Sequence, residues 1–290
     1  MRTNEDRLPH MAVPGKPRHP TGSSWQVSHE GEPFFSHRTG GILYNVKVGD
    51  SVYGWPADHL EPCVSMIAGQ GGRKDPNFAL QGFACVGNRV RIMSGDAKGE
   101  EGVVTGKHGG IETVMVDFAD EVLERMSYED KLLVRSVGPG LELLDYPTVK
   151  PWNLDPGLLV KMGIEEVGGK LHVPVVAIVP GGLMGSGIGS SMPFAGDYDI
   201  QTADNDLLAE HGLATLRLGD FVAITDHHAT HGWTTKKGGV IIGIIIHGDS
   251  FKGGHGPGVT SLLTATDGTL VPKLVPQANI AETLGIGRAR

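Results

Sequence analysis

Cysteine, long apolar runs and excess positive charge are all scarce in this chain of 290 residues. The two cysteines, Cys63 and Cys85, are too few for a disulfide framework or a cysteine-based zinc knuckle, so we expect a reducing, cytoplasmic setting. The longest apolar stretch, residues 238–248, is far shorter than the roughly 18 residues of a membrane helix. The N-terminus also lacks the apolar core of a secretory signal. A net charge of −8 disfavours a protein that grips nucleic acid.

Glycine and proline, by contrast, are abundant, with 44 and 18 residues. Glycine costs about 1 kcal/mol at a helix-interior site, so this composition favours short strands joined by tight turns. We therefore predict a mainly β fold, a β-rich α+β class. Two helices are expected, one at 155–164 with Asp155 as N-cap and Pro156 at its first position, and one at 202–213.

The composition divides the chain into three parts. Residues 1–33 are expected to form a disordered or loosely draped arm, and residues 34–146 a β domain. Three prolines between 147 and 156 interrupt regular structure and mark a boundary. Residues 147–290 are expected to form a second β-rich domain.

Residues 87–118 carry a local hairpin pattern in which Val90 and Ile92 alternate inward and 94–102 supplies a glycine-rich turn. This stretch resembles the KOW motif of SH3-like barrels, which implies such a barrel in the N-terminal half. Residues 86–135 hold 7 Lys and Arg against 10 Asp and Glu, a local charge of −3. Because phosphate backbones are bound by positive charge, we expect a scaffold that binds no nucleic acid.

Three buried strands in the second half end in loops that are rich in glycine and ligand-type side chains. The loops are 179–191, 225–232 and 247–260. A rigid core holds such strand ends in place, so binding and catalytic groups gather there in many folds. These loops are the predicted location of a site.

The densest of these loops is "TDHHATHG", residues 225–232. In an extended strand Asp226 and His228 share one face, roughly 7 Å apart at the backbone, while the intervening histidine faces the core. We predict a divalent metal held by Asp226, His228 and His247, with Asp226, His228 and His231 in catalysis. Zinc is the first choice, with calcium or manganese as alternatives. The other possibility is a hydrogen-bonded strand end whose imidazoles are already satisfied.

Further candidates share an imidazole or carboxylate near a predicted strand end or turn: Asp249, His255, Asp197, Asp199, His59 and Glu61. The pattern at Asp249 favours a residue that only caps its turn, and residues 196–206 favour a solvated acidic turn. The loop 185–190 lacks the residues of a Walker or Rossmann phosphate loop. Its backbone N–H groups at Gly185, Ser186 and Gly187 are instead predicted to hold an oxyanion.

Two short motifs, each after a buried strand, resemble those of acetamidase/formamidase-type amide hydrolases. The matching residues are Gly181, Gly182 and Met184 in the first motif and Asp226, His228, Ala229 and Gly232 in the second. The resemblance implies a metal-dependent hydrolase of a small amide or other C–N bond, with a small-molecule substrate. The sequence departs from that pattern at Leu183 and Gly185, where the family has Asn and Asp, and at Lys236 and Lys237, where it has acidic residues.

The combination of a barrel with "GDYDI" at 196–200 and "GHGPGVT" at 254–260 also resembles an uncharacterised bacterial and archaeal family known only as a domain of unknown function. That resemblance implies no activity. The alternative function is therefore a non-catalytic binding or scaffold protein whose SH3-like barrel recruits a partner. The apolar stretch 240–247 has few amphipathic helices to cover it, so we expect a homo-oligomer, a dimer or a multiple of dimers.

Overall fold

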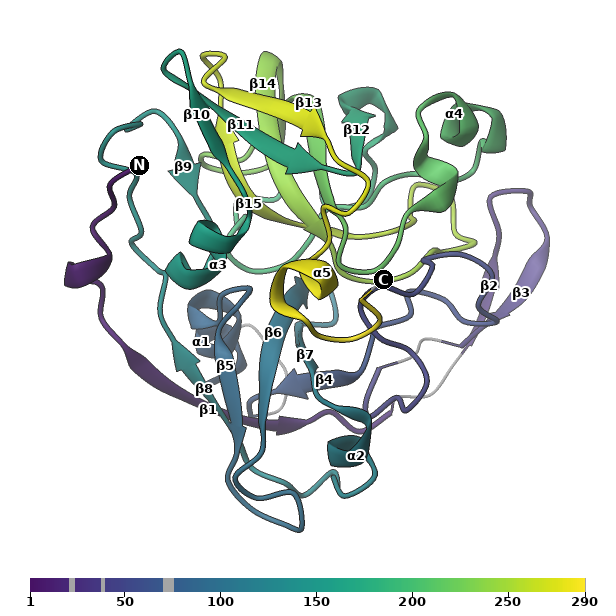
Figure 1. Cartoon of the computed structure of the whole chain (residues 1–290). Helices are drawn as coiled ribbons and strands as arrows, with labels where there is room; N and C mark the ends of the chain where they lie inside the picture. The colour runs from purple at the N-terminus through teal and green to yellow at the C-terminus, as the bar shows by residue number, and fades with distance from the viewer. Residues whose placement is uncertain (21–23, 38–39, 70–75, 290) are drawn as a thin grey trace.

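The computed structural model describes residues 1–20, 24–37, 40–69 and 76–289, and it is β-rich with short helices, as predicted (Figure 1). Two β structures are stacked, a closed barrel from the N-terminal half and an open sheet from the C-terminal half. Among the described helices, none has the length and apolar character needed to cross a membrane.

The barrel has six strands, and every neighbouring pair is antiparallel. Val90 and Ile92 are buried inside it, on the face predicted for them. Around the barrel the order is β1 (Met11–Pro17), β4 (Val64–Ile67), β7 (Thr113–Asp117), β6 (Glu101–His108), β5 (Arg89–Ile92) and β8 (Leu132–Ser136). Two short helices, α1 (Pro76–Phe83) and α2 (Asp120–Leu123), flank it, and a 3-10 turn, η1 (Glu5–Arg7), precedes it.

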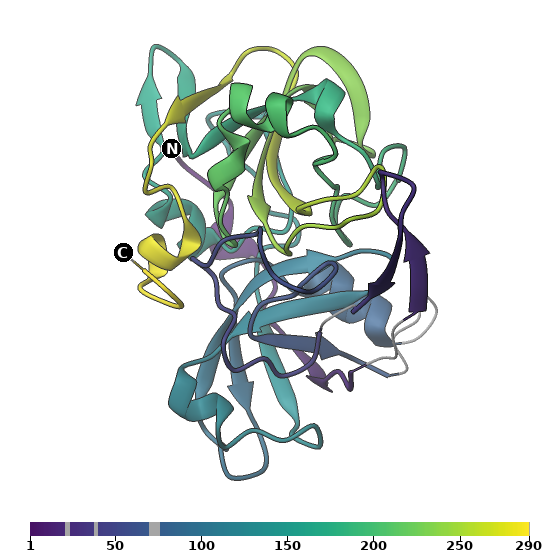
Figure 2. The same cartoon turned by 90° about the vertical axis from the view of Figure 1, so that its right-hand side faces the viewer.

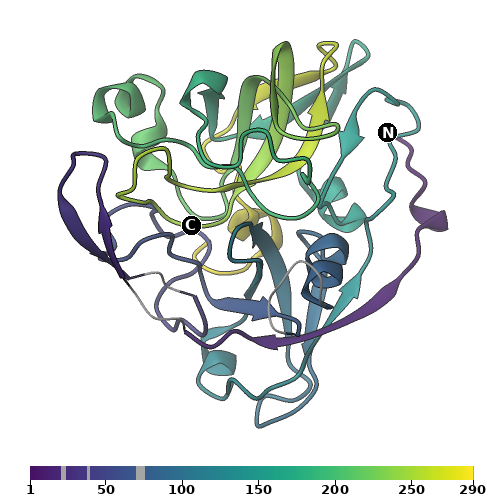
Figure 3. The ribbon, with the colours of Figure 1, turned by 180° about the vertical axis from the view of Figure 1, so that it is seen from behind.

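The N-terminal segment is more ordered than the sequence predicts. Its first residues run along the outside of the molecule, where Asn4 donates to the Gly140 carbonyl oxygen at 3.0 Å (Figure 3). The chain then forms β1, which pairs with both β4 and β8 and buries Val13. Without β1 those two strands would be open edges. Pro14 and Pro17 lie within β1 and obscure its strand pattern, since proline cannot donate to a ladder.

A separate hairpin follows, formed by β2 (Ser24–Val27) and β3 (Pro33–Ser36). It stands at the side of the molecule, next to both the barrel and the C-terminal half (Figure 2). Strand alternation puts the side chains of Ser24 and Gln26 on one face of β2. Trp25 and Val27 occupy the other face and are exposed. The hairpin therefore presents a polar face inward and an apolar face outward.

The C-terminal half is built on a five-stranded sheet. Its order is β12 (Ala177–Pro180), β13 (Phe221–His228), β14 (Thr234–Ile245), β15 (Val259–Ala265) and β9 (Lys150–Pro151). Only the β12–β13 pair in this sheet is parallel. A three-stranded sheet packs nearby in the order β10 (Glu165–Val167), β11 (Lys170–Val175) and β16 (Leu270–Leu274).

Short helices end and cover these strands. They are α3 (Pro156–Lys161), α4 (Asn205–Glu210) and α5 (Ile280–Leu284), with 3-10 turns η2 (Gly181–Leu183) and η3 (Leu213–Thr215). The predicted cap of α3 is confirmed, because Asp155 accepts from the Gly157 amide at 2.6 Å and Pro156 begins the helix. The helix predicted at 202–213 is shorter than expected, since Asp204 caps α4 and the chain leaves it at His211.

Both faces of the five-stranded sheet are covered within one chain. Ile242 and Ile244 of β14 belong to a core shared with α3, β11 and α5. Ile241 and Ile245 face the opposite core, which includes Leu208 of α4. The sheet faces therefore give no reason to require a second subunit, and the homo-oligomer stays a prediction without that argument.

The two halves meet where the end of β6 runs against the start of β15. The Lys107 amide donates to Thr260 Oγ1 at 3.2 Å, and that hydroxyl donates back to the Lys107 carbonyl oxygen at 3.0 Å. A side chain at Gly106 would collide with Ile246, so glycine permits the close approach. This junction places His108, the last residue of β6, beside the residues that follow β14.

Candidate metal centre between the two halves

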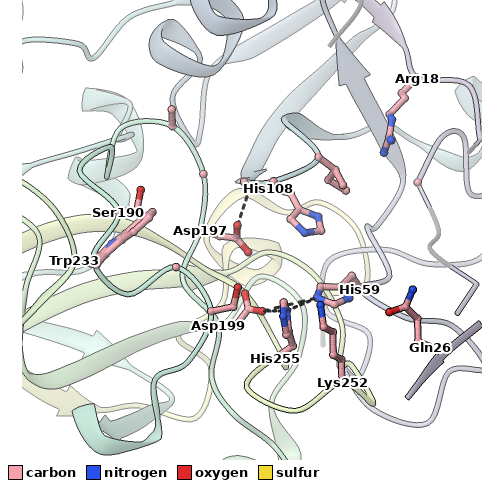
Figure 4. Close-up of a pocket in the computed structure, with 18 of the residues that line it drawn as sticks. Arg18, Gln26, His59, His108, Ser190, Asp197, Asp199, Trp233, Lys252 and His255 are labelled. Atoms are coloured by element: carbon pink, nitrogen blue, oxygen red, sulfur yellow. Dashed lines mark hydrogen bonds and ion pairs between the residues drawn. The ribbon is translucent and has the colours of Figure 1, made fainter. Parts of the chain in front are cut away.

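A cavity of about 590 Å³ opens at this junction (Figure 4). Both halves line it. The barrel half contributes His59, from the loop before β4, and His108, and the C-terminal half contributes Asp197, Asp199 and His255 from two loops. Ligand-type side chains from residues nearly 200 positions apart thus share one wall.

His59 and His108 are each held by a buried carboxylate behind the ring. His59 Nδ1 lies 3.0 Å from Asp58 Oδ1, and His108 Nδ1 lies 2.7 Å from Glu61 Oε1. Glu61 is completely buried and also accepts hydrogen bonds from the hydroxyl groups of two neighbouring residues, Ser65 and Thr113. A carboxylate behind an imidazole fixes the ring's orientation and tautomer, and it is the usual second layer around metal-bound histidine.

His247 completes the set from the position immediately after β14, where it is fully buried. Its Nδ1 is 2.8 Å from the Gly248 carbonyl oxygen, which fixes the ring and leaves Nε2 facing the carboxylates. Nε2 lies 2.9 Å from Asp197 Oδ2 and 3.7 Å from Asp199 Oδ1. The other oxygen of Asp197 accepts from the Gly109 amide at 2.7 Å, so the carboxylate is also held from the barrel side.

The contact between His247 and Asp197 lacks hydrogen-bond geometry, as does the contact at His59 Nδ1. Among the described residues, neither His247 Nε2 nor Asp197 Oδ2 has a partner with hydrogen-bond geometry, although both atoms are buried. Buried polar atoms without a hydrogen-bond partner are rare, because each loses its hydration without gaining a hydrogen bond in return. A cation that both atoms bind would satisfy the two at once.

The ligand atoms form two overlapping groups, each within 4.8 Å. One contains His59, Asp199 and His247, and the other contains His108, Asp197 and His247. Ligands at about 2.0–2.2 Å from a tetrahedral ion would be separated by distances of this order. Imidazole with carboxylate suits zinc or manganese, whereas calcium takes 6–8 oxygen ligands, which these groups do not supply.

Charge coupling within the wall shifts several pKa values. Burial lowers the pKa of His247, but its contacts with Asp197 and Asp199 raise it more, leaving it well above the ordinary value. Burial also lowers the pKa of His59, but its contacts with Asp199 and Asp58 raise it more, so the pKa is above the ordinary value. Burial raises the pKa of Asp199, yet the surrounding imidazoles lower it well below its usual range. Burial and the neighbouring His247 lower the pKa of His108. The carboxylates thus attract positive charge to this wall.

His255 lies closer to solvent than the other rings. Its Nδ1 is 3.0 Å from Asp199 Oδ2 and 3.1 Å from His59 Nε2. His255 therefore contacts the inner carboxylate of Asp199 from the side of the open cavity.

The histidine-rich strand end at 225–232 does not join this cavity. A bulge interrupts β13 between Thr225 and His227, and Asp226 sits in the left-handed region at φ 55°, exposed, where it accepts from the Gly238 amide at 2.8 Å. His228 is half-buried and His231 is exposed. In the described part of the chain, neither residue joins Asp226 or His247 in a group of ligand distance. The bulge breaks the two-residue alternation on which their predicted convergence depended.

The glycine-rich loop 185–190 lies at the cavity, but two of the backbone amides predicted to hold an oxyanion already donate to other backbone groups. The Gly185 amide donates to the Asp199 carbonyl oxygen and the Ser186 amide to the Gly254 carbonyl oxygen, both at 2.8 Å. These two N–H groups hold the loops together and do not face a substrate. Ser186 and Gly187 do line the cavity.

The structure places most of the secondary candidates at this cavity and Asp249 at another. His59, Asp197, Asp199 and His255 line the cavity, and the acidic turn that the sequence also allowed is buried at both aspartates. Asp249 accepts a hydrogen bond from Thr202 and lines a different cavity of about 250 Å³.

Sequence reasoning missed His108 and Asp58. His108 ends a buried strand and is followed by two glycines, the same form as His247 followed by Gly248. That recurrence was the available signal.

Comparison with known proteins gives a family. Among curated proteins, none matches this chain significantly. A solved structure described as the crystal structure of TM1086 is 46% identical, with a TM-score of 0.92, over 97% of this chain and 98% of that one. The N-terminal model of a domain of unknown function, DUF4438, matches residues 25–160, and its C-terminal model matches residues 161–284, a boundary slightly later than the one predicted. With both models matched in order, the chain belongs to the DUF4438 family.

Proposed function

We propose that this protein is a divalent-metal-dependent hydrolase whose metal is held by His247 and Asp197, with His59, His108 and Asp199 completing the ligand set. The proposal rests on two buried atoms, His247 Nε2 and Asp197 Oδ2, which lie 2.9 Å apart without hydrogen-bond geometry. The carboxylates behind His59 and His108 support it, because they direct those rings toward the same wall.

The cavity fits a small-molecule reaction. Its volume of about 590 Å³ lies within the usual range for such sites. A bound divalent ion would lower the pKa of a coordinated water to about 7 and supply a nucleophile. His255 contacts Asp199 and reaches the open cavity, so it is placed to accept a proton as general base.

The bond to be hydrolysed is proposed on separate grounds. An amide or other C–N bond follows from the resemblance of residues 179–184 and 225–232 to acetamidase/formamidase-type enzymes. Residues Gly181, Asp226 and His228 of those motifs lie outside the lining of the cavity. The metal centre therefore does not depend on the choice of bond.

The experiment is elemental analysis of tag-free protein purified without chelator, followed by an ammonia-release assay on small amides. We expect close to one zinc or manganese ion per chain in the wild type. His247→Ala and Asp197→Asn should each lose the ion and the activity. His172→Ala, which removes a half-exposed histidine on β11, is the matched control and should retain both.

A double variant, Asp226→Ala with His228→Ala, separates the two possible metal positions. We expect it to keep the ion. Loss of metal in this variant, together with full retention in His247→Ala, would move the centre to the strand end and refute the cavity. Wild-type protein that stays empty after zinc and manganese are supplied would refute a metal enzyme and favour a binding or scaffold role.

A further inference from the structure

The cavity has a second charged feature opposite in sign to its carboxylates. Arg18 and Lys252 both line it, Arg18 from the segment just after β1 and Lys252 from the loop between β14 and β15 (Figure 4). The described lining thus pairs two carboxylates on the ligand wall with two cations elsewhere. This is notable in a chain with 33 acidic and 25 basic side chains.

Arg18 differs from the other arginines that the structure describes. Arg2, Arg125 and Arg288 are exposed and each has a carboxylate partner. The buried Arg217 contacts Asp220 at 3.7 Å. Four further arginines have no carboxylate partner in the described part of the chain, but they are exposed to water: Arg7, Arg89, Arg91 and Arg135.

Arg18 alone among the described arginines is partly buried and has no carboxylate within ion-pair distance in the described residues. Its backbone is fixed, since its amide donates to the Ser65 carbonyl oxygen at 2.7 Å. Partial burial of a guanidinium loses hydration that a bound anion would replace, and the guanidinium fork matches a carboxylate in shape and charge.

The hairpin strand β2 adds polar groups beside these cations. Ser24 and Gln26 line the cavity, and Gln26 Nε2 donates to Ser24 Oγ at 2.9 Å. That bond leaves the Gln26 carbonyl oxygen as an acceptor and the Ser24 hydroxyl hydrogen as a donor. The cavity therefore offers hydrogen-bonding groups as well as positive charge.

We propose that the substrate is a small anionic molecule whose carboxylate is bound by Arg18, with Lys252 assisting, while its reacting group lies against the cavity wall that contains His59, His108 and Asp197. The inference rests on the proposed function for the reacting end only. The anion site at Arg18 is formed by different residues, and it can be tested by binding alone.

The test uses metal-loaded protein and calorimetric titration with acetate and with dicarboxylates of increasing length, from malonate to adipate. At least one dicarboxylate should bind about tenfold or more tightly than acetate, because its second carboxylate adds a charge-assisted hydrogen bond at Arg18. Arg18→Gln should remove that advantage without changing metal content, and Lys252→Gln should reduce it less. Lys237→Gln, on the exposed part of β14, is the matched control.

The outcomes are distinct. If no dicarboxylate binds more tightly than acetate, or if Arg18→Gln binds them as the wild type does, the inference is wrong while a retained metal still supports the proposed function. If the protein holds no metal but Arg18→Gln still weakens dicarboxylate binding, the anion site stands and the metal centre falls. Inorganic phosphate, titrated in parallel, shows whether a phosphate group is preferred over a carboxylate at Arg18.

Discussion

Two histidine-rich regions of this molecule have opposite organisation. At the end of β13, three histidines and an aspartate occupy six consecutive positions, yet their side chains have different neighbours and different exposure. At the junction of the halves, His59, His108 and His247 are spread over 189 positions, yet their ring centroids lie 4.2–5.7 Å apart. Closeness along the chain and closeness in space are unrelated here.

The difference lies in what surrounds each imidazole. His108 and His247 each have an acceptor at Nδ1 that fixes the ring, and His59 Nδ1 lies 3.0 Å from an Asp58 oxygen. The carboxylate of Asp197 is itself anchored by the Gly109 amide. At the strand end, the described partner of the His228 ring is the Thr230 hydroxyl at 3.4 Å. The Asp226 carboxylate accepts a hydrogen bond from the Gly238 amide. Metal ligands are usually preorganised by hydrogen bonds to neighbouring groups. Of the two regions, the junction has its ligand side chains held in this way and the strand end does not.

Substitution of two glycines tests most directly which region binds a metal, because each glycine lies against a histidine of one region. A methyl group at Gly258 would collide with Asp197 Oδ2 and His247 Nε2, and one at Gly181 would collide with His227 Nδ1 and the backbone beside it. Gly258→Ala should therefore displace both principal ligands and abolish metal retention. Elemental analysis of the two purified variants makes the comparison.

Gly181→Ala is the matched control for that experiment. It should lower the melting temperature, because the neighbouring Thr225 carbonyl oxygen is backbone and moves less easily than a side chain, but it should keep the ion. A Gly258→Ala protein that folds and retains stoichiometric metal would contradict the assignment of His247 and Asp197 as ligands.

A smaller effect is expected from the carboxylate behind His108. Glu61→Gln replaces an acceptor of the imidazole N–H with an amide of similar size, so the ring is held less firmly and its basicity falls. Metal affinity should decrease by about 10- to 100-fold, as is usual when such second-layer partners are changed. Competition against a chromogenic chelator measures it.

Glu101→Gln, an exposed carboxylate at the start of the same strand β6, should have no effect on affinity. Equal affinity in Glu61→Gln and the wild type would mean that His108 does not bind the ion, and would leave the group of His59, Asp199 and His247.

The sequence predicted the β-rich class, the inward face of Val90 and Ile92, and the cap of α3, because each depends on local alternation or on a local hydrogen bond. Local rules could not predict which histidines and carboxylates line the cavity. Asp226 takes a left-handed backbone conformation at a bulge, which no alternation rule anticipates. His108 meets His247 only because two halves of the chain pack together, and that contact leaves no periodic pattern in the sequence.

Several candidate residues of the second half lie at or next to the cavity for a general structural reason. His247, Asp197, Asp199 and His255 follow strands or precede them, and strand ends are where a fold gathers side chains. What was missing was the partner surface, since the barrel supplies His59 and His108 together with the carboxylates that hold them. A single sequence shows which residues have side chains that suit a metal or catalytic site. The packing of distant segments decides which of those residues meet.

The smallest effect on the site is expected at Asp117, a buried carboxylate of β7 in the barrel that lacks the imidazole partners of Asp197 and Asp199. Burial raises the pKa of Asp117 to about 6, although Lys47 opposes the shift. The folded protein therefore holds this proton more tightly than the unfolded chain, so wild-type stability should fall as pH rises from about 4 to about 6 and remain lower above that. Asp117→Asn lacks the titration. It should equal the wild type near pH 4 and exceed it by about 3 kcal/mol at pH 8, with unchanged metal content. Urea unfolding at the two pH values measures the difference, and an advantage that is the same at both would show that the charge of Asp117 is not what destabilises the barrel.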